Sequence, residues 1–149
     1  MNTKLSRRVT TAAALTVLAV GGAIAGTSPA SAATVKPVAA KSAAAAYNGV
    51  CGTGYKVIDS TPVGNSGTTY LTWNEAKGKN CAVTIRNTAG AKLYMEVRLT
   101  ALESEEGDAV DAGQYTSYAG PVYVNGRGYC VSWIGTIGSA TSSDWGHCS

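Results

Sequence analysis

The sequence contains no phenylalanine, a single histidine (His147) and no Cys-x-x-Cys pair among its 149 residues. Zinc sites are built from closely spaced Cys and His ligands, so this composition argues against a structural zinc. A general base or a Ser-His-Asp triad would depend on His147, which follows Asp144 closely and precedes Cys148. We expect this histidine to be a polar neighbour of a terminal disulfide, and the sequence predicts no enzyme activity, no catalytic residue, no metal and no cofactor.

Positive charge is scarce beyond the N-terminus. The net charge of the whole chain is +3, and Lys4, Arg7 and Arg8 equal that excess. From Tyr47 onward nine acidic residues outnumber seven basic ones, which are Lys56, Lys77, Lys79, Arg86, Lys92, Arg98 and Arg127. Binding to a phosphate backbone requires a basic stripe, so the sequence excludes nucleic acid as a partner.

The N-terminus has the three parts of a secretory signal. Basic residues precede an apolar, Ala-rich stretch over residues 12–25, and Ala30-Ser31-Ala32 has the small-x-small pattern of a cleavage site. The apolar stretch is shorter than the roughly 20 residues of a membrane-spanning helix and contains Gly21 and Gly22. We therefore predict a signal peptide at residues 1–32, cleavage after Ala32, a secreted location and no membrane association once the signal is removed.

Two further regions follow the signal. Residues 33–46 form a low-complexity, Ala-rich stretch that Pro37 interrupts, and so short a segment is a poor helix by itself in water. It predicts a linker or a removable pro-segment. From Tyr47 the composition changes to glycine with β-branched and aromatic residues, which predicts a secreted β domain at residues 47–149.

The pattern of the β domain is one of alternation, and no window longer than about ten residues has a helical stripe. Alternation is clearest over residues 93–100 and repeats over residues 81–86, where we expect Cys81, Val83 and Ile85 to face inward. The other predicted strands cover residues 68–73, 129–134, 55–59, 115–118 and 122–124. The fold class is therefore all-β, a small antiparallel β-sandwich or barrel of about six to eight strands.

Turn residues separate these predicted strands. Asn65-Ser66-Gly67 and the stretch from Lys77 to Asn80 supply residues that tolerate positive φ. Asn125-Gly126 is the strongest hairpin signal, because Asn-Gly suits the two-residue turns that join antiparallel neighbours.

All four cysteines, Cys51, Cys81, Cys130 and Cys148, fall in the β domain. An even number of cysteines in a small exported chain predicts disulfides. Four cysteines allow three pairings, and the sequence alone does not choose among them. We favour Cys51–Cys81 and Cys130–Cys148, which would close the N-terminal and C-terminal segments separately.

Tyrosine and tryptophan dominate the aromatic residues, with eight and three copies. Exposed aromatic rings can stack on sugars or anchor a partner, and they can equally form cross-strand pairs. The candidate ligand-binding residues are Tyr70, Tyr94, Tyr123 and Trp145, where Tyr123 lies between two apolar residues that should point inward. We favour the cross-strand role for the rings as a group.

Five of the nine acidic residues crowd into the segment from residue 103 to residue 111. Clustered carboxylates can bind calcium, but the spacing matches no calcium loop, and a solvated turn is the preferred interpretation. The residues concerned are Glu103, Glu105, Glu106, Asp108 and Asp111.

Several stretches together resemble the spore-associated protein A family of filamentous actinomycetes. They are Tyr47-Asn48-Gly49-Val50-Cys51-Gly52, Gly54-Tyr55-Lys56-Val57-Ile58-Asp59-Ser60, Gly78-Lys79-Asn80-Cys81, Tyr118-Ala119-Gly120-Pro121-Val122-Tyr123-Val124 and Gly146-His147-Cys148. None of them is catalytic. The resemblance implies a small exported protein of the spore or cell surface without an assigned enzymatic activity, and it carries over no functional residue.

Two functions follow as expectations. The first is a non-enzymatic secreted protein associated with the spore or cell surface, extracellular and in contact with other spore-envelope components. The alternative is a module that binds cell-wall or extracellular polysaccharide through exposed Tyr and Trp side chains.

Overall fold

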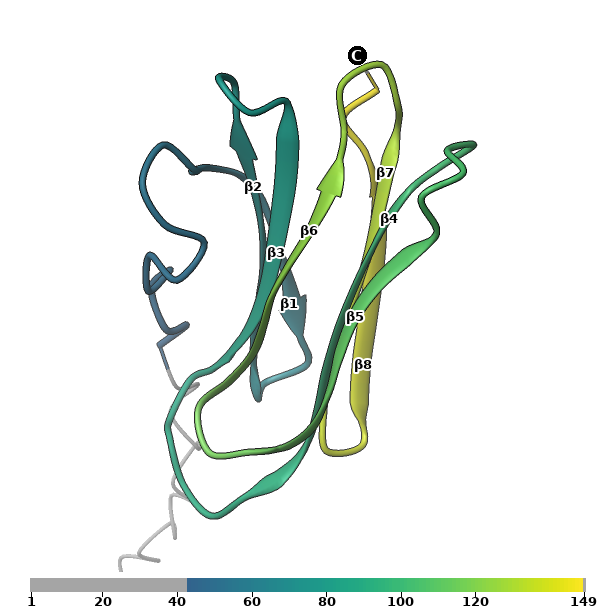
Figure 1. The fold of residues 1–149 in the computed structure, drawn as a ribbon. Helices are drawn as coiled ribbons and strands as arrows, with labels where there is room; N and C mark the ends of the chain where they lie inside the picture. Colours follow the sequence, from purple (N-terminus) through teal and green to yellow (C-terminus); the bar gives the residue numbers. More distant parts are fainter. Residues whose placement is uncertain (1–42, 149) are drawn as a thin grey trace, which may run out of the picture. The chain divides into compact units, whose positions relative to one another are not determined.

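A computed structural model describes residues 43–148. The predicted signal peptide, its cleavage site after Ala32 and most of the predicted linker lie outside the described residues. The described residues form eight strands, which pack as two layers (Figure 1). In chain order they are β1 (Lys56–Val63), β2 (Gly67–Asn74), β3 (Lys79–Arg86), β4 (Leu93–Ala101), β5 (Asp108–Tyr115), β6 (Tyr118–Asn125), β7 (Val131–Ile137) and β8 (Ala140–Gly146).

The strands form two antiparallel sheets of four. Sheet A has the order β1-β2-β3-β6 and sheet B the order β5-β4-β7-β8, with hairpins joining β1 to β2, β2 to β3, β4 to β5 and β7 to β8. Two separate sheets confirm the predicted all-β fold and decide in favour of a sandwich over a barrel. No helix of the described residues is long and apolar enough to cross a bilayer.

The core lies between the sheets and comes from alternate residues of their strands. On β4 the predicted apolar face is confirmed, because Met95, Val97 and Leu99 are fully buried. Ala119, Val122 and Val124 of β6 face this core from sheet A, while Tyr123 between the two valines is 37% exposed, as expected. The largest fully buried side chain is Trp133, whose Nε1 donates a hydrogen bond to Thr61 Oγ1 at 2.9 Å.

The predicted inner face of residues 81–86 is wrong. Ala82 belongs to the core cluster, and Thr84 Oγ1 lies near Gly135 of sheet B, so these residues face the other sheet. Cys81, Val83 and Ile85 are also buried, but on the outer face of β3. Strict alternation could not separate the two faces here, because both are covered.

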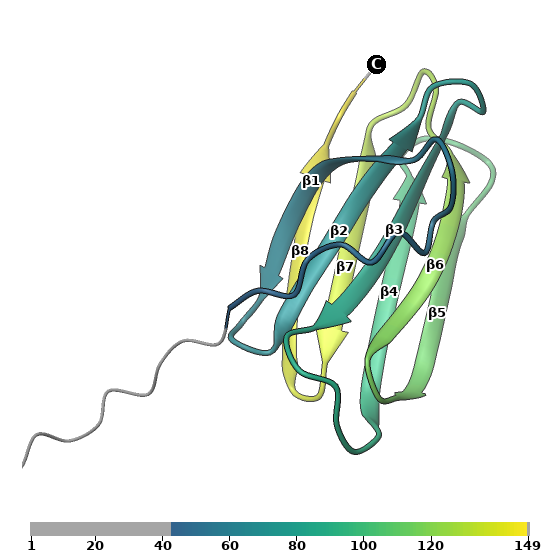
Figure 2. The ribbon, with the colours of Figure 1, turned by 90° about the vertical axis from the view of Figure 1, so that its left-hand side faces the viewer.

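The cover of that outer face is the N-terminal segment, residues 43–55. Figure 2 shows this segment crossing sheet A. The predicted Cys51–Cys81 disulfide is present and fastens the segment to β3, with Tyr55 and Tyr47 packed against it in a second, smaller cluster. Ala45 also takes part, because its N–H donates to Asn87 Oδ1 at 3.2 Å.

Edge strands of the two sheets differ most from the strands predicted from the sequence. Residues 115–118, predicted as one strand, instead span the last residue of β5, a bend at Thr116 and Ser117, and the first residue of β6. Strands β5 and β8 were not predicted, because their sequences, DAVDAGQY and ATSSDWG, are rich in polar or small residues. Both are edge strands with one neighbour, where burial places few demands on composition.

The hairpin predicted at Asn125-Gly126 is also wrong. β6 and β7 lie in different sheets, so the loop between them crosses the sandwich. A two-residue turn of type I′ needs positive φ at both central residues, and here positive φ occurs at Gly128 instead. The Arg127 side chain reaches back to Glu75, with Nη1 and Oε1 3.1 Å apart, which holds this loop beside the β2–β3 turn.

Candidate functional site

The C-terminal end of β8 carries the residues that most need a functional explanation. The predicted Cys130–Cys148 disulfide is present and joins the residue before β7 to the chain after β8. His147 has a left-handed backbone, with φ of 54°, which is uncommon for a residue other than glycine. This turn brings the imidazole against the Trp133 indole, with the ring centroids 5.9 Å apart.

His147 bridges the two sheets. Its Nε2 donates a hydrogen bond to Asp59 Oδ2 on β1, at 2.9 Å, and this hydrogen bond lowers the pKa of the Asp59 carboxyl. The partner of the histidine is thus an aspartate far away in the sequence and not the neighbouring Asp144. Together with the Trp133–Thr61 hydrogen bond, the pair ties β1 of sheet A to β7 and β8 of sheet B.

The lowered pKa of Asp59 predicts a pH-dependent contribution to stability. A carboxyl whose pKa falls on folding stabilises the folded state at pH values above its pKa in the unfolded chain, which is 3.8. This stabilisation is lost as the pH falls through the lower pKa that the carboxyl has in the folded state. Asp59→Asn should therefore unfold at lower temperature than the wild type at about pH 6, by an amount worth roughly 0.2–1 kcal/mol for so exposed a pair.

Circular dichroism melts at about pH 6 and about pH 2 measure this effect. The difference between Asp59→Asn and the wild type should close at the lower pH. Asp144→Asn is the matched control, because Asp144 forms no ion pair within the described residues. A difference that persists unchanged at the lower pH would show that the carboxylate charge is not its source.

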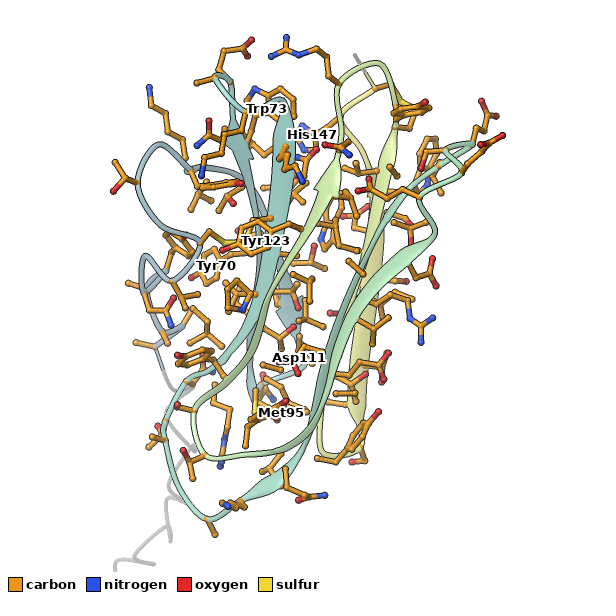
Figure 3. The ribbon with its side chains drawn as sticks, viewed as in Figure 1. Tyr70, Trp73, Met95, Asp111, Tyr123 and His147 are labelled. Atoms are coloured by element: carbon orange, nitrogen blue, oxygen red, sulfur yellow. A yellow bond between two sulfur atoms is a disulfide. The ribbon has the colours of Figure 1, made fainter. Side chains whose placement is uncertain are left out.

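A hollow of about 270 Å³ opens beside His147, at the end of the sandwich where Figure 3 labels His147 and Trp73. Its polar side chains bond within the domain. Trp73 Nε1 donates to Glu75 Oε2 at 2.8 Å, and Asn80 Nδ2 donates to the Thr72 carbonyl at 3.2 Å. Both hydrogen bonds lie within the β2–β3 hairpin, so these polar side chains have partners without a ligand.

Two of the four predicted ligand-binding aromatics face the N-terminal segment. The Tyr70 hydroxyl donates to the Ala45 carbonyl at 2.6 Å, and the Tyr123 hydroxyl donates to the Cys51 carbonyl at 3.2 Å. Both rings also contact tyrosines of the same segment, Tyr47 and Tyr55. Figure 3 shows Tyr70 and Tyr123 on this side of the sandwich. Tyr70 and Tyr123 therefore anchor the N-terminal segment to sheet A.

The other two candidates lie on the outer face of sheet B, at opposite ends of it. Tyr94 is the second residue of β4 and is 41% exposed. Its hydroxyl donates to Glu96 Oε2 at 2.7 Å, and this hydrogen bond raises the pKa of the Tyr94 phenol. Trp145, near the end of β8, is 68% exposed and is the most exposed large apolar side chain of the described residues. The four predicted residues therefore do not form one site.

Tyr129 and Trp145 together line a different hollow, which has a volume of about 290 Å³. Tyr129 begins the strand predicted at residues 129–134, and its sequence pattern alone does not indicate a ligand-binding role. A signal was nevertheless available, because the Cys130–Cys148 pairing brings the residue before Cys130 close to the residues before Cys148. A third hollow, of about 390 Å³, is lined by Trp145 together with Ser132, Ile134 and Ser143.

The acidic segment proves to be a turn followed by a strand. Glu106 accepts hydrogen bonds from Asn125, and Asp108 accepts them from Arg98 and Thr100. Asp111 lies on the opposite face of β5 and accepts from the backbone N–H of Gly120 at 2.6 Å. Among residues 43–148 there is no group of three or more His, Cys, Asp or Glu side chains that could hold a metal ion.

Comparison with known proteins gives one informative result. No family model matches the chain, and no solved structure matches it. The chain is 51% identical over 128 residues to spore-associated protein A of Streptomyces coelicolor, an alignment that covers 86% of this chain and 79% of that protein. Identity at this level over most of both chains confirms the resemblance that the five sequence stretches indicated. The chain belongs to the spore-associated protein A family.

Proposed function

We propose that this protein is a non-enzymatic component of the spore or cell surface, exported by a signal peptide at residues 1–32. The observation that carries the proposal is the 51% identity to a protein named for its association with spores. The described domain supports it. Both pairs of cysteines are oxidised, and structural disulfides persist mainly outside the reducing cytosol.

The absence of enzymatic activity is part of the proposal and rests on the use of the polar side chains. The imidazole of the single histidine is bonded to Asp59, Asp108 accepts from Thr100 of the neighbouring β4, and Asp111 accepts from Gly120 of β6 in the other sheet. A general acid or base must reach a substrate proton. Here these groups connect strands to one another.

Fractionation of sporulating cultures tests the proposal. We expect the protein in the spore or cell-surface fraction, with a mass that begins at Ala33 and includes two disulfides. A variant in which Ala30 and Ala32 are replaced by leucine should keep residues 1–32, because the peptidase requires small residues at both positions. Retention of the wild-type protein in the cytoplasm with its leader intact would refute the proposal.

A second candidate function is binding of cell-wall or extracellular polysaccharide. The specific observation in its favour is Trp145, a ring that is 68% exposed at the edge of two hollows. This function is compatible with the first, because a surface protein needs something to hold it at the surface. Binding of the purified protein to insoluble peptidoglycan, chitin and cellulose measures it, and material that stays in the supernatant with all three would exclude it.

A further inference from the structure

Trp145 differs from the other two tryptophans in how its indole N–H is used. Trp73 Nε1 donates to Glu75 and Trp133 Nε1 donates to Thr61, whereas Trp145 Nε1 has no acceptor among the described residues. Buried or structural indoles usually find a partner for this group. The hydroxyl of Tyr129, a ring that is 36% exposed beside Trp145, likewise has no partner in the described part of the chain. Trp145 and Tyr129 therefore each expose part of an aromatic ring to solvent, together with a polar group that has no partner among the described residues.

The backbone around this pair is firmly held. Trp145 lies opposite Ser132 in the ladder between β8 and β7, and the Cys130–Cys148 disulfide closes the end of that ladder. Its own N–H is bonded to Asp144 Oδ1 at 2.8 Å. Because the backbone of Trp145 is already held, binding a ligand would order only the torsions of its side chain, which keeps the entropic cost of binding small.

The surroundings of the pair select the chemistry of the ligand. Leu102 lines both hollows, and the polar groups around them are the hydroxyls of Ser132 and Ser143 and the carboxylates of Glu103 and Asp144. Neither hollow has a Lys or Arg in its described lining. Arg98, a cation on the same sheet face, is bonded to Glu96 and Asp108.

A phosphate- or sulfate-bearing polymer would meet two carboxylates there with no cation to balance its charge. A neutral sugar chain suits the same groups, because its C–H faces pack on aromatic rings and its hydroxyls can donate to carboxylates and exchange hydrogen bonds with serine hydroxyls. The two hollows share Trp145 and Leu102 in their linings, so together they give room for several residues of one sugar chain beside the indole.

We propose that Trp145 and Tyr129 form a stacking platform for a neutral, pyranose-based polysaccharide on the outer face of sheet B, with Glu103 and Asp144 as acceptors for sugar hydroxyls. This inference deepens the proposed surface role and rests on it, since it names how the protein is held at the surface. It replaces four scattered candidates with one pair, because Tyr70 and Tyr123 anchor the N-terminal segment and Tyr94 lies at the far end of the sheet.

Titration calorimetry with cellohexaose and chitohexaose, on protein purified with both disulfides oxidised, tests the platform. Trp145→Ala should weaken binding by about tenfold or more, and Tyr129→Ala should weaken it by a smaller factor. Tyr94→Ala is the matched control, since it removes an exposed ring from the same sheet face and should leave the affinity unchanged. Both platform rings are surface groups, so melting temperatures of the variants should stay close to that of the wild type.

Three results would overturn the inference. They are equal affinity of Trp145→Ala and the wild type for the sugars, absence of sugar binding by the wild type, and a clear preference for choline, which would identify the aromatic pair and its two carboxylates as a site for alkylammonium groups. Fractionation of the wild-type strain distinguishes failure of the platform from failure of the proposed function. A wild-type protein found at the surface without sugar affinity refutes only the platform, whereas a wild-type protein found in the cytoplasm refutes the surface role itself.

Discussion

Gly135→Val is expected to destabilise the domain by about 3 kcal/mol or more, the upper part of the range for overpacked cores. Gly135 lies on the inner face of β7, directly opposite Thr69 and Thr84 of sheet A. A Cβ at this position would overlap Thr69 Oγ1 and would lie 2.8 Å from Thr84 Oγ1. Those two hydroxyls are buried and bonded to each other at 3.0 Å, so displacing them also threatens a buried hydrogen bond.

Urea unfolding followed by tryptophan fluorescence measures this effect, and Gly146→Ala is the control. Gly146 also lies in a strand, but a Cβ there would meet no atom within 4 Å and its φ is not in the left-handed region. We expect Gly146→Ala to change the free energy of unfolding by less than about 0.5 kcal/mol. Similar midpoints for Gly135→Val and the wild type would show that the sheets can separate at Gly135 without cost.

Removal of the Cys51–Cys81 disulfide is the second change with a large expected effect. The cysteines are 30 residues apart, and the chain-entropy estimate for a loop of that length is about 3–4 kcal/mol. The double variant Cys51→Ala, Cys81→Ala also loses the bond that fastens the N-terminal segment to β3. We expect a lower midpoint of unfolding and faster amide exchange over residues 43–55.

The double variant Cys130→Ala, Cys148→Ala provides the comparison for this experiment. Its cysteines are only 18 residues apart, so its loss of stability should be slightly smaller, and it should leave exchange in the N-terminal segment as in the wild type. If both double variants exchanged equally fast over residues 43–55, then Tyr70 and Tyr123, and not Cys51, would be what holds that segment.

Strands are predicted best from the sequence where one face of the strand is buried and the other is exposed to solvent. Residues 93–100 alternate cleanly because β4 is such a strand, and the prediction for it was correct to within one residue. The cysteine pairs were also correctly favoured, since each joins neighbours along the chain. By contrast, β3 is buried on both faces, so its alternation carries no information on which face meets sheet B.

The candidate site was only partly predictable for a different reason. Exposed and anchoring tyrosines look identical in a sequence, because a ring on the polar side of a strand can face solvent or another segment. Only the path of residues 43–55 shows that Tyr70 and Tyr123 are anchoring tyrosines. The Asp59–His147 pair depends on a left-handed residue and on strands at opposite ends of the chain, and no local pattern encodes it.

The cysteines are paired in the order in which they occur, first with second and third with fourth. A chain that emerges N-terminus first can therefore close its first bridge before the third cysteine appears. Each thiol meets its native partner as the earliest one available, and a simple oxidase suffices for this order of events. Maturation of this domain should consequently proceed at a normal rate in cells that lack a disulfide isomerase.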